Sequence, residues 1–321
     1  MKLLKQLYEI HSPSGKEWAL KKFIKRYIKA NIPGCKIGYD QRGNMYIKKG
    51  ESETYPCIVA HLDQVQKQHP RDFQAIEANG IIFGYSPKAK SFFGLGADDK
   101  NGCWIALKAL QHFSALKVAL FVEEEIGCRG SSDADMRFFN DCRFALQCDR
   151  KGSSDLITQI GWTDLCSHEF LKAIEADKFG YRNETGLMTD IEALKENGLE
   201  VSAVNISCGY YNPHTDEEIT VISDLLNCKS FVFHIIENAT EVYPHTPDEL
   251  YMYRQDEQLE ELIDLLDYNC CYDPSLTAED YYHYYKDMFP NLSLDDFKRV
   301  VDELKAYHEP LKHTDNEQQP F

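Results

Sequence analysis

The chain has 321 residues, of which 43% are hydrophobic, enough for a sizeable core in one large domain or two ordinary ones. It carries 52 acidic and 35 basic residues, a net charge of −17. This charge argues against a nucleic-acid-binding surface, which needs a basic stripe, and against docking on anionic membranes.

Helix and strand signals alternate through the first part of the chain. Ser14 and Glu17 stand at capping-box spacing before the first periodic apolar segment. The hairpin signal is Asn79-Gly80 between two apolar runs. In chain order, the expected elements are a helix over 18–28, strands over 35–39, 45–47 and 58–59, a hairpin of 73–76 and 81–85, and a helix over 104–116.

The same alternation continues to about residue 240. The expected elements are strands around Val118 and Phe144, a helix over 167–176, a helix from 187 to about 197, a strand over 201–207 and a helix over 221–237. Strands alternating with helices predict an α/β fold, with a mixed, mostly parallel central sheet and helices on both faces.

The composition changes after about residue 240. Leucines at 259, 262, 265 and 266 have helical spacing, and so do the apolar residues from Phe297 to Leu304, after a possible N-cap at Ser293. Strand signals are absent there, and the end of the chain from about His313 is expected to be disordered. The sequence therefore predicts two parts, 1–240 and a helical C-terminal extension over 241–321.

The N-terminus and the cysteines predict a cytoplasmic protein. Charges interrupt the first ten residues, and no apolar run has the length of a signal-peptide core or of a membrane span of about 18 residues. The eleven cysteines are scattered and lack zinc-ribbon spacing. In a chain without an export signal, this indicates reduced, mostly buried thiols.

Three consecutive acids are the most informative feature of the chain. Glu123, Glu124 and Glu125 follow the apolar run 118–122, which is typical of a buried strand. Acidic groups at the end of a buried strand are costly unless a cation compensates them, and a metal ion is the usual compensator.

Four other segments supply matching ligands. His61-Leu62-Asp63 and Asp149 each follow an apolar strand-like run, Asp98 opens a helix, and His214 follows the strand predicted over 201–207. Ligands at strand ends match the general rule for open α/β sheets. Histidines with carboxylates suit two divalent metal ions, best Zn²⁺, with Mn²⁺ or Co²⁺ as alternatives.

Three interpretations of these residues stay open at this point. Asp155 is a reserve candidate for the role of Asp149. His245-Thr246-Pro247 mimics the surroundings of His214 and is a rival for the final histidine. Asp98 and its neighbour Asp99 also read as an N-cap pair for the helix that follows.

Together, the motifs resemble the co-catalytic metallopeptidases of the M20, M28 and M42 families, over residues 12–217 and in the family's order. The segments Gly-Ala-Asp-Asp-Lys-x-Gly at 96–102 and Glu-Glu-Ile-Gly at 124–127 are most similar to the peptidase T (tripeptidase) branch of M20. The resemblance implies a zinc exopeptidase-like fold and a metal-dependent hydrolase. It also implies a cis peptide bond between Asp98 and Asp99.

The resemblance assigns a role to each site residue. It implies that His61 and Asp149 bind one metal ion, and that Glu125 and His214 bind the other. Asp98 would bridge the two ions. By the same resemblance, Asp63 orients the His61 ring, and Glu124 is the general base that activates a metal-bridging water.

One departure from the M20 pattern is expected. M20 enzymes insert a lid domain between the ligand represented by Asp149 and the final histidine, but the interval from Asp149 to His214 is too short for one. Residues 1–240 are therefore expected to form a catalytic domain without a lid, as in the M28 enzymes.

The predicted function is a two-metal exopeptidase that cleaves short peptides, either an aminopeptidase or a di- or tripeptidase. The closest alternative is an N-acyl amino acid deacylase or amidohydrolase, because the same site cleaves either amide. An alternative of another class is a non-catalytic peptide-binding protein on the same fold.

Overall fold

The computed structural model describes residues 1–161, 163–246, 259, 262, 263, 265, 266, 275–286, 288, 289 and 292–308. The chain divides into two compact units, Met1–Pro247 and Asp248–Phe321.

The first unit is built around a nine-stranded sheet of order β1-β2-β7-β3-β8-β12-β9-β10, with β11 also paired to β9. Its central strands β7, β3, β8 and β12 run parallel, whereas β1, β2, β9 and β10 pair antiparallel at the two sides. This arrangement confirms the predicted mixed α/β fold. The strands are β1 (Cys35–Tyr39), β2 (Met45–Lys49), β3 (Tyr55–His61), β7 (Leu116–Phe121), β8 (Cys142–Arg150), β9 (Asp155–Ile160), β10 (Thr163–Asp164), β11 (Arg182–Gly186) and β12 (Ala203–Ser207).

Both faces of the central strands are buried, which explains their continuous apolar sequences. In β3, Ile58 and Ala60 belong to one hydrophobic core, whereas Cys57 and Val59 belong to the core on the opposite face. This alternation follows from the period of two along a strand.

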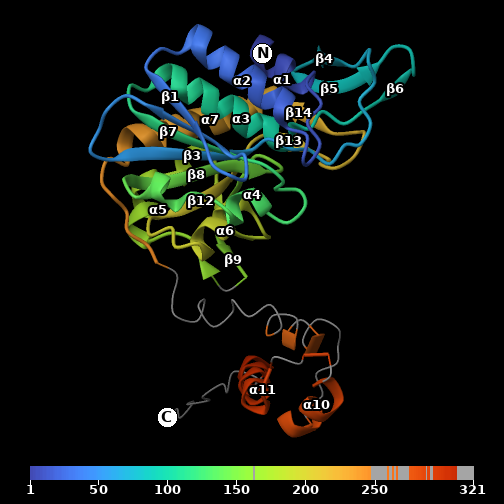
Figure 1. Ribbon diagram of the computed structural model, residues 1–321, viewed down its shortest axis with the longest axis vertical. Helices are drawn as coiled ribbons and strands as arrows, with labels where there is room; N and C mark the ends of the chain where they lie inside the picture. The colour runs from blue at the N-terminus through green and yellow to red at the C-terminus, as the bar shows by residue number, and fades with distance from the viewer. Residues whose placement is uncertain are drawn as a thin grey trace, which may run out of the picture. The chain divides into compact units, whose positions relative to one another are not determined.

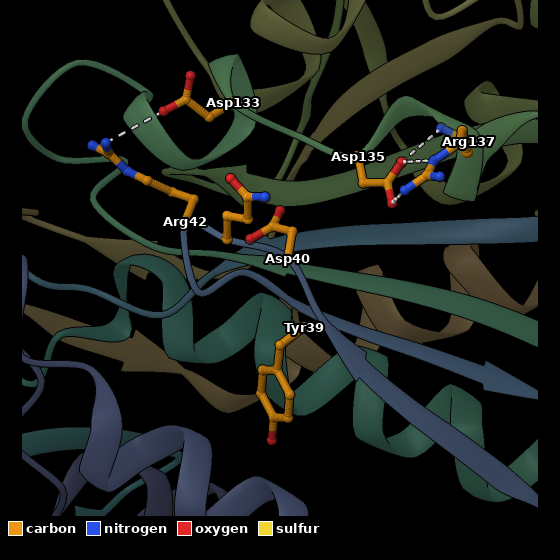
Figure 2. Close-up of a pocket in the computed structure, with 7 residues that line it drawn as sticks. Tyr39, Asp40, Arg42, Asp133, Asp135 and Arg137 are labelled. Carbon is orange, nitrogen blue, oxygen red and sulfur yellow. Dashed lines mark hydrogen bonds and ion pairs between the residues drawn. The ribbon is translucent and has the colours of Figure 1, made fainter.

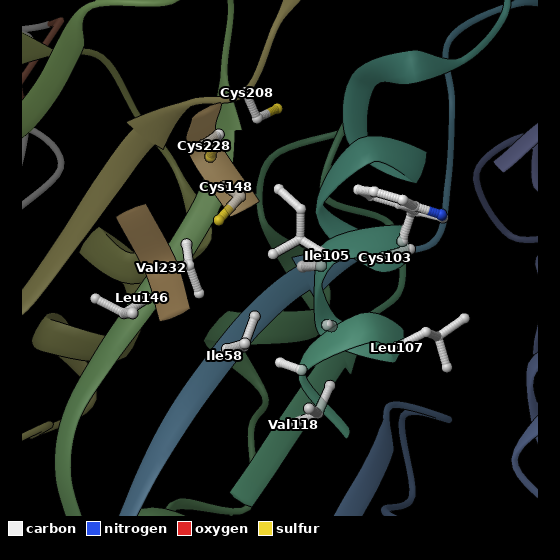
Figure 3. Close-up of a cluster of buried hydrophobic side chains, with 14 of the residues drawn as sticks. Ile58, Cys103, Ile105, Leu107, Val118, Leu146, Cys148, Cys208, Cys228 and Val232 are labelled. Atoms are coloured by element: carbon white, nitrogen blue, oxygen red, sulfur yellow. The ribbon is translucent and has the colours of Figure 1, made fainter. Parts of the chain in front are cut away.

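Helices cover the sheet on both sides (Figure 1). The larger core lies beneath α1 (Lys2–Tyr8), α2 (Trp18–Asn31), α3 (Ala97–His112), α5 (His168–Ile174) and α7 (Ile222–Asn238). Figure 3 shows part of this core, where Ile105 of α3 and Val232 of α7 lie near sheet residues such as Ile58, Val118 and Leu146. The opposite face carries α6 (Asp190–Glu196) and α4 (Arg129–Ser132), which pack on each other, and the short η1 (Met136–Phe139). A second short turn of helix, η2 (Ala176–Phe179), packs on α7.

A smaller sheet carries one of the candidate histidines. Its order is β13-β14-β5-β4, with β6 paired to β5. The predicted hairpin is confirmed, with positive φ at both Asn79 (50°) and Gly80 (79°), as a tight primed turn requires. The loop between β13 and β14 contains His214. The strands are β4 (Gln74–Ala78), β5 (Ile81–Ser86), β6 (Ser91–Phe92), β13 (Tyr210–Tyr211) and β14 (Ile219–Val221).

Two local predictions were wrong. The helix expected over 104–116 is α3, which begins at Ala97 and ends at His112, because Leu116 already starts the buried strand β7. The capping box of Ser14 and Glu17 does not form, since Glu17 occupies the N-cap of α2 without a side-chain cap bond. The Ser14 hydroxyl instead donates to Asp63, a tertiary contact that the local sequence pattern cannot show.

The second unit has its own small core. Its described helices are α10 (Ala278–Tyr285) and α11 (Leu294–His308), whose buried residues include Tyr281 and Phe297. Ser293 and Asp296 bond reciprocally at the start of α11, as expected of an N-cap at Ser293. The end predicted to be disordered, from about His313, lies outside the described residues. Within the part of the chain that is described, no helix has the length and apolarity to cross a bilayer.

Candidate two-metal site

The predicted ligands meet where the parallel strands β3, β7 and β8 end. His61 is the last residue of β3, and Asp149 is the second-last residue of β8. The acidic turn 123–125 follows β7, which ends at Phe121. Asp98 comes from the first turn of α3 and His214 from the β13–β14 loop. Segments far apart in the sequence thus converge at one edge of the sheet.

The ligand atoms form two groups that share Asp98. One group is His61, Asp98 and Asp149, the other is Asp98, Glu125 and His214, and within each group the atoms lie within 4.8 Å of one another. His61 Nε2 lies 3.0 Å from Asp98 Oδ1 and 3.6 Å from Asp149 Oδ2. His214 Nε2 lies 3.2 Å from Asp98 Oδ2 and 3.1 Å from Glu125 Oε2. The two oxygens of Asp98 therefore face different histidines.

The donor set fits two divalent cations. Within the described part of the chain, the ion-pair partners of Asp98, Glu125 and Asp149 are histidines. Glu125 Oε1 is buried and has no hydrogen-bond partner. Buried carboxylates without a compensating cation are costly. One carboxylate between two histidine–carboxylate groups is a donor set that zinc and similar ions accept.

Several acidic side chains of the site and His214 have shifted pKa values, because these groups lie close together and are partly or fully buried. Burial raises the pKa of Glu124 to about 8, and burial likewise raises the pKa of Glu125 and, more strongly, of Asp149. Hydrogen bonds to Asp98 and Glu125 raise the pKa of His214 to about 10. Each of these shifts favours the protonated form of its group, and because metal ligands must be deprotonated, metal binding would release protons.

Asp63 connects the first histidine to the acidic turn. Its backbone oxygen lies 3.2 Å and its carboxylate Oδ1 3.5 Å from His61 Nδ1, the ring nitrogen that faces away from Asp98. The same carboxylate accepts hydrogen bonds from the backbone N–H groups of Glu124 (3.0 Å) and Glu125 (3.2 Å), and from Ser14 Oγ (2.7 Å). Such partners orient a ligand ring. The hydrogen bonds between Asp63 and the acidic turn were not predicted from the sequence.

Asp98 and Asp99 are interpreted from the sequence both as a metal-ligand segment and as an N-cap pair, and their side chains have different surroundings. Their peptide bond is cis, as the resemblance implied. The Asp98 side chain lies in the site, whereas the buried Asp99 accepts hydrogen bonds from Gly102 N (2.9 Å) and His61 N (3.2 Å). Asp99 thus bonds to the first helical turn, and a Cβ at Gly102 would lie 2.4 Å from Asp99 Oδ1, which explains the glycine there.

Glu123 does not point into either group. Its carboxylate pairs with Arg42, and its backbone adopts a left-handed φ of 56°. Arg42 also lies 3.3 Å from Asp133, at a surface pocket lined by residues 39–42, Asp133, Asp135 and Arg137 (Figure 2). The guanidinium next to the acidic turn is therefore already neutralised by two carboxylates.

The two reserve candidates lie outside both groups. Asp155 accepts a hydrogen bond from Arg150 Nε at 3.3 Å. His245 Nδ1 lies 3.0 Å from the ammonium of Lys195. The structure places Asp149 and His214 in the groups instead.

Sequence reasoning missed Glu218, which is fully buried immediately before β14. Its carboxylate accepts hydrogen bonds from the backbone N–H groups of Gly96 (2.6 Å) and Asp98 (3.1 Å). Burial and the charge of Asp98 raise the pKa of Glu218 to about 8. The available signal was weak, because an acid before the short run 219–221 reads as an exposed strand end.

No family model and no curated protein matches the sequence. Solved structures with a similar fold include the aminopeptidase PepT of Bacillus cereus (TM-score 0.59, 13% identity, covering 74% of this chain and 96% of that one). They also include a tripeptidase of Staphylococcus aureus (0.58, 15%, 73% and 96%) and the aminopeptidase APDkam598 of Desulfurococcus kamchatkensis (0.54, 18%, 74% and 94%).

The chain has the fold of these peptidases. Four strands of this chain, β9 to β12, lie between Asp149 and β13 in the sequence, and all four belong to the main sheet. The loop that carries His214 joins β13 and β14 of the smaller sheet and lies close to Asp98 and Glu125.

Proposed function

We propose that the protein is a two-metal aminopeptidase that acts on short peptides. The observation that carries this proposal is Asp98, whose two carboxylate oxygens face the separate histidines His61 and His214. The shared fold with aminopeptidases and a tripeptidase supports it. A TET aminopeptidase also has this fold (TM-score 0.55), and the neighbours favour a co-catalytic metallopeptidase of the M42 type rather than the peptidase T branch of M20 that the sequence motifs suggested.

In this proposal, His61 and Asp149 would hold one ion, Glu125 and His214 the other, and Asp98 both. Zn²⁺ suits these ligands best, and Mn²⁺ or Co²⁺ would also be accepted. When bound, the ions supply Lewis acidity that polarises the scissile carbonyl and lowers the pKa of water.

Glu124 belongs to neither ligand group, so its carboxylate is not committed to a metal ion. Its Oε2 lies 3.8 Å from His61 Nε2, and its backbone N–H is held by Asp63. The side chain keeps 13% of its surface exposed, so it is accessible from the site. Glu124 would take a proton from the attacking water and pass it to the leaving amine nitrogen.

Arg42 lies next to the acidic turn but is not available to bind a peptide carboxylate, because it is already paired with Glu123 and Asp133. Two divalent ions would balance the four carboxylates of the site, counting Glu124, so the charge of these carboxylates does not decide between the two ends of a peptide. The proposed preference for the amino end rests on the pairing of Arg42 and on the fold shared with aminopeptidases.

The deciding experiment compares free-amine tripeptides with their N-acetylated forms and with N-acyl amino acids, using protein loaded with Zn²⁺, Mn²⁺ or Co²⁺. We expect release of the N-terminal residue from the free-amine peptides only. Cleavage of only the acylated compounds would assign the protein as a deacylase. Metal binding without hydrolysis of any compound would leave the peptide-binding alternative.

A further inference from the structure

Glu218 connects the two chain segments that carry Asp98 and His214. Its Oε2 accepts hydrogen bonds from Gly96 N (2.6 Å) and Gln66 Nε2 (3.1 Å), and its Oε1 accepts one from Asp98 N (3.1 Å). A single buried carboxylate thus holds the backbone on both sides of Ala97, immediately before the shared ligand.

The loop that carries His214 lies directly against the same segment. Asp216 Oδ1 accepts a hydrogen bond from Gly94 N at 3.3 Å. The contact is so close that a Cβ at Gly94 would lie 2.6 Å from the Thr215 backbone oxygen. Glu218 ends this loop four residues after His214, so it joins the loop to the start of α3.

A chain of buried polar side chains leads from Glu218 to the buried Lys100. Gln66 donates to Glu218, Gln64 Nε2 donates to Gln66 Oε1 at 3.0 Å, and the Lys100 ammonium donates to Gln64 Oε1. Two buried ionisable groups, Glu218 and Lys100, are costly for stability alone. Both lie next to the segment that carries Asp98, which supports a role in placing the ligands.

We propose that Glu218 is the positioning residue for the group formed by Asp98, Glu125 and His214. It sets the spacing between Asp98 and His214, and thereby the affinity for the second metal ion. This inference rests on the proposed two-metal function.

The test is the Glu218→Gln variant of the full chain. The amide keeps the size of the side chain but has one acceptor oxygen, so it cannot accept from both Gly96 N and Asp98 N. Glu217→Gln is the matched control, because it makes the same chemical change at the exposed neighbouring residue in the same loop. Each protein is stripped with a chelator and titrated with Co²⁺, following the visible absorption spectrum and the bound metal per chain.

We expect the wild type and Glu217→Gln to bind two ions. Glu218→Gln should bind the second ion about 10- to 100-fold more weakly, the usual effect of losing a group that orients ligands. The first ion should lose less affinity, because Asp98 is the one member of its group that Glu218 contacts. His214→Ala should lose the same ion as Glu218→Gln, with the same change in the spectrum.

Failure of the proposed two-metal function can be distinguished from failure of the positioning role of Glu218. A wild type without divalent ions would refute the proposed function. Two ions bound with unchanged affinity by a folded Glu218→Gln, or equal weakening of both, would refute the positioning role alone. If the circular dichroism of Glu218→Gln shows misfolding, Glu218→Asp decides. It keeps two acceptor oxygens for folding, but its side chain is one methylene shorter, so the backbone at Gly96 and Asp98 must shift to reach it. Selective weakening of the second ion in Glu218→Asp supports the role, and unchanged binding overturns it.

Discussion

Within the acidic turn, neighbouring residues have different surroundings. Glu123 pairs with Arg42, Glu124 lies beside His61 without belonging to a ligand group, and Glu125 faces His214. The backbone produces this division, because φ at Glu123 is 56° and the next two N–H groups are held by Asp63. At this scale, tests should replace one carboxyl group at a time.

The first prediction concerns Glu124→Gln. The amide cannot accept a proton from water, so kcat for a free-amine tripeptide should fall by about 10²- to 10⁴-fold, the usual contribution of a general base. Metal content should not change, because Glu124 is outside both ligand groups. Glu123→Gln is the control and should keep kcat within a few fold. Full activity in Glu124→Gln would exclude its role as the base.

The second prediction concerns pH and His69, whose pKa is lowered to about 4, chiefly by burial. Its ring stacks on His11 (5.2 Å between centroids) and contacts Phe73 (4.3 Å). In the unfolded chain the pKa of histidine is about 6.5. Between about pH 4 and 6.5 the unfolded state therefore binds more protons, and the free energy of unfolding should rise with pH.

Urea denaturation at pH 4.5 and 6.5 measures this effect. The gain in stability over that interval should be smaller in His69→Gln than in the wild type. His168→Gln replaces an exposed histidine and is the control. Equal gains in the wild type and His69→Gln would show that His69 does not contribute.

At the scale of elements, the site depends on the close packing of three parallel strands. β3, β7 and β8 are buried on both faces, and each ends beside a candidate ligand. Their register aligns the ends, with Ala60 opposite Leu120 and His61 opposite Phe121. A loss of packing in these strands should therefore lower stability and loosen the site together.

The third prediction is Leu146→Ala, three residues before Asp149 in β8. Leu146 is fully buried between the sheet and the helices above it. The cavity should lower the free energy of unfolding by about 2–5 kcal/mol, measured in urea. Leu187→Ala is the control, because Leu187 is 79% exposed, and surface changes usually stay within about 0.5 kcal/mol. Similar losses in both variants would contradict the central role of β8.

At the scale of the whole molecule, all predicted site residues lie in the unit Met1–Pro247. We keep as a proposal that the catalytic part is the lidless segment 1–240 and that 241–321 is an appended helical extension. The described helices of the second unit bury their own core. Its residues contribute nothing to either ligand group among the described residues.

The fourth prediction is that divalent metal stabilises the fold. Ions that bind only the native state at 100 times their dissociation constant contribute about 2.7 kcal/mol per site. Chelation should therefore lower the melting temperature by several degrees, and Zn²⁺ should restore it. The double variant His61→Ala/His214→Ala should melt at the same temperature with and without metal. A wild type insensitive to chelation would contradict metal binding in the native state.

Much of the fold and the site was predictable from local pattern. Apolar runs that end in His61, Asp149 and the acidic turn predicted strands with ligands at their carboxyl ends, because parallel strands bring those ends together. The same patterns failed at Ser14 and Glu17, whose partners lie far along the chain.

The sequence by itself determined which side chains have the chemistry for metal binding and which strands carry them, since both follow from residue type and spacing. Only the tertiary structure separated Asp149 from Asp155 and His214 from His245, and only it revealed Glu218. The physical reason is that these distinctions depend on which groups the fold brings next to each side chain: Arg150 pairs with Asp155, Lys195 contacts His245, and backbone N–H groups bind Glu218. The path of the folded chain decides these contacts, and residue type alone does not.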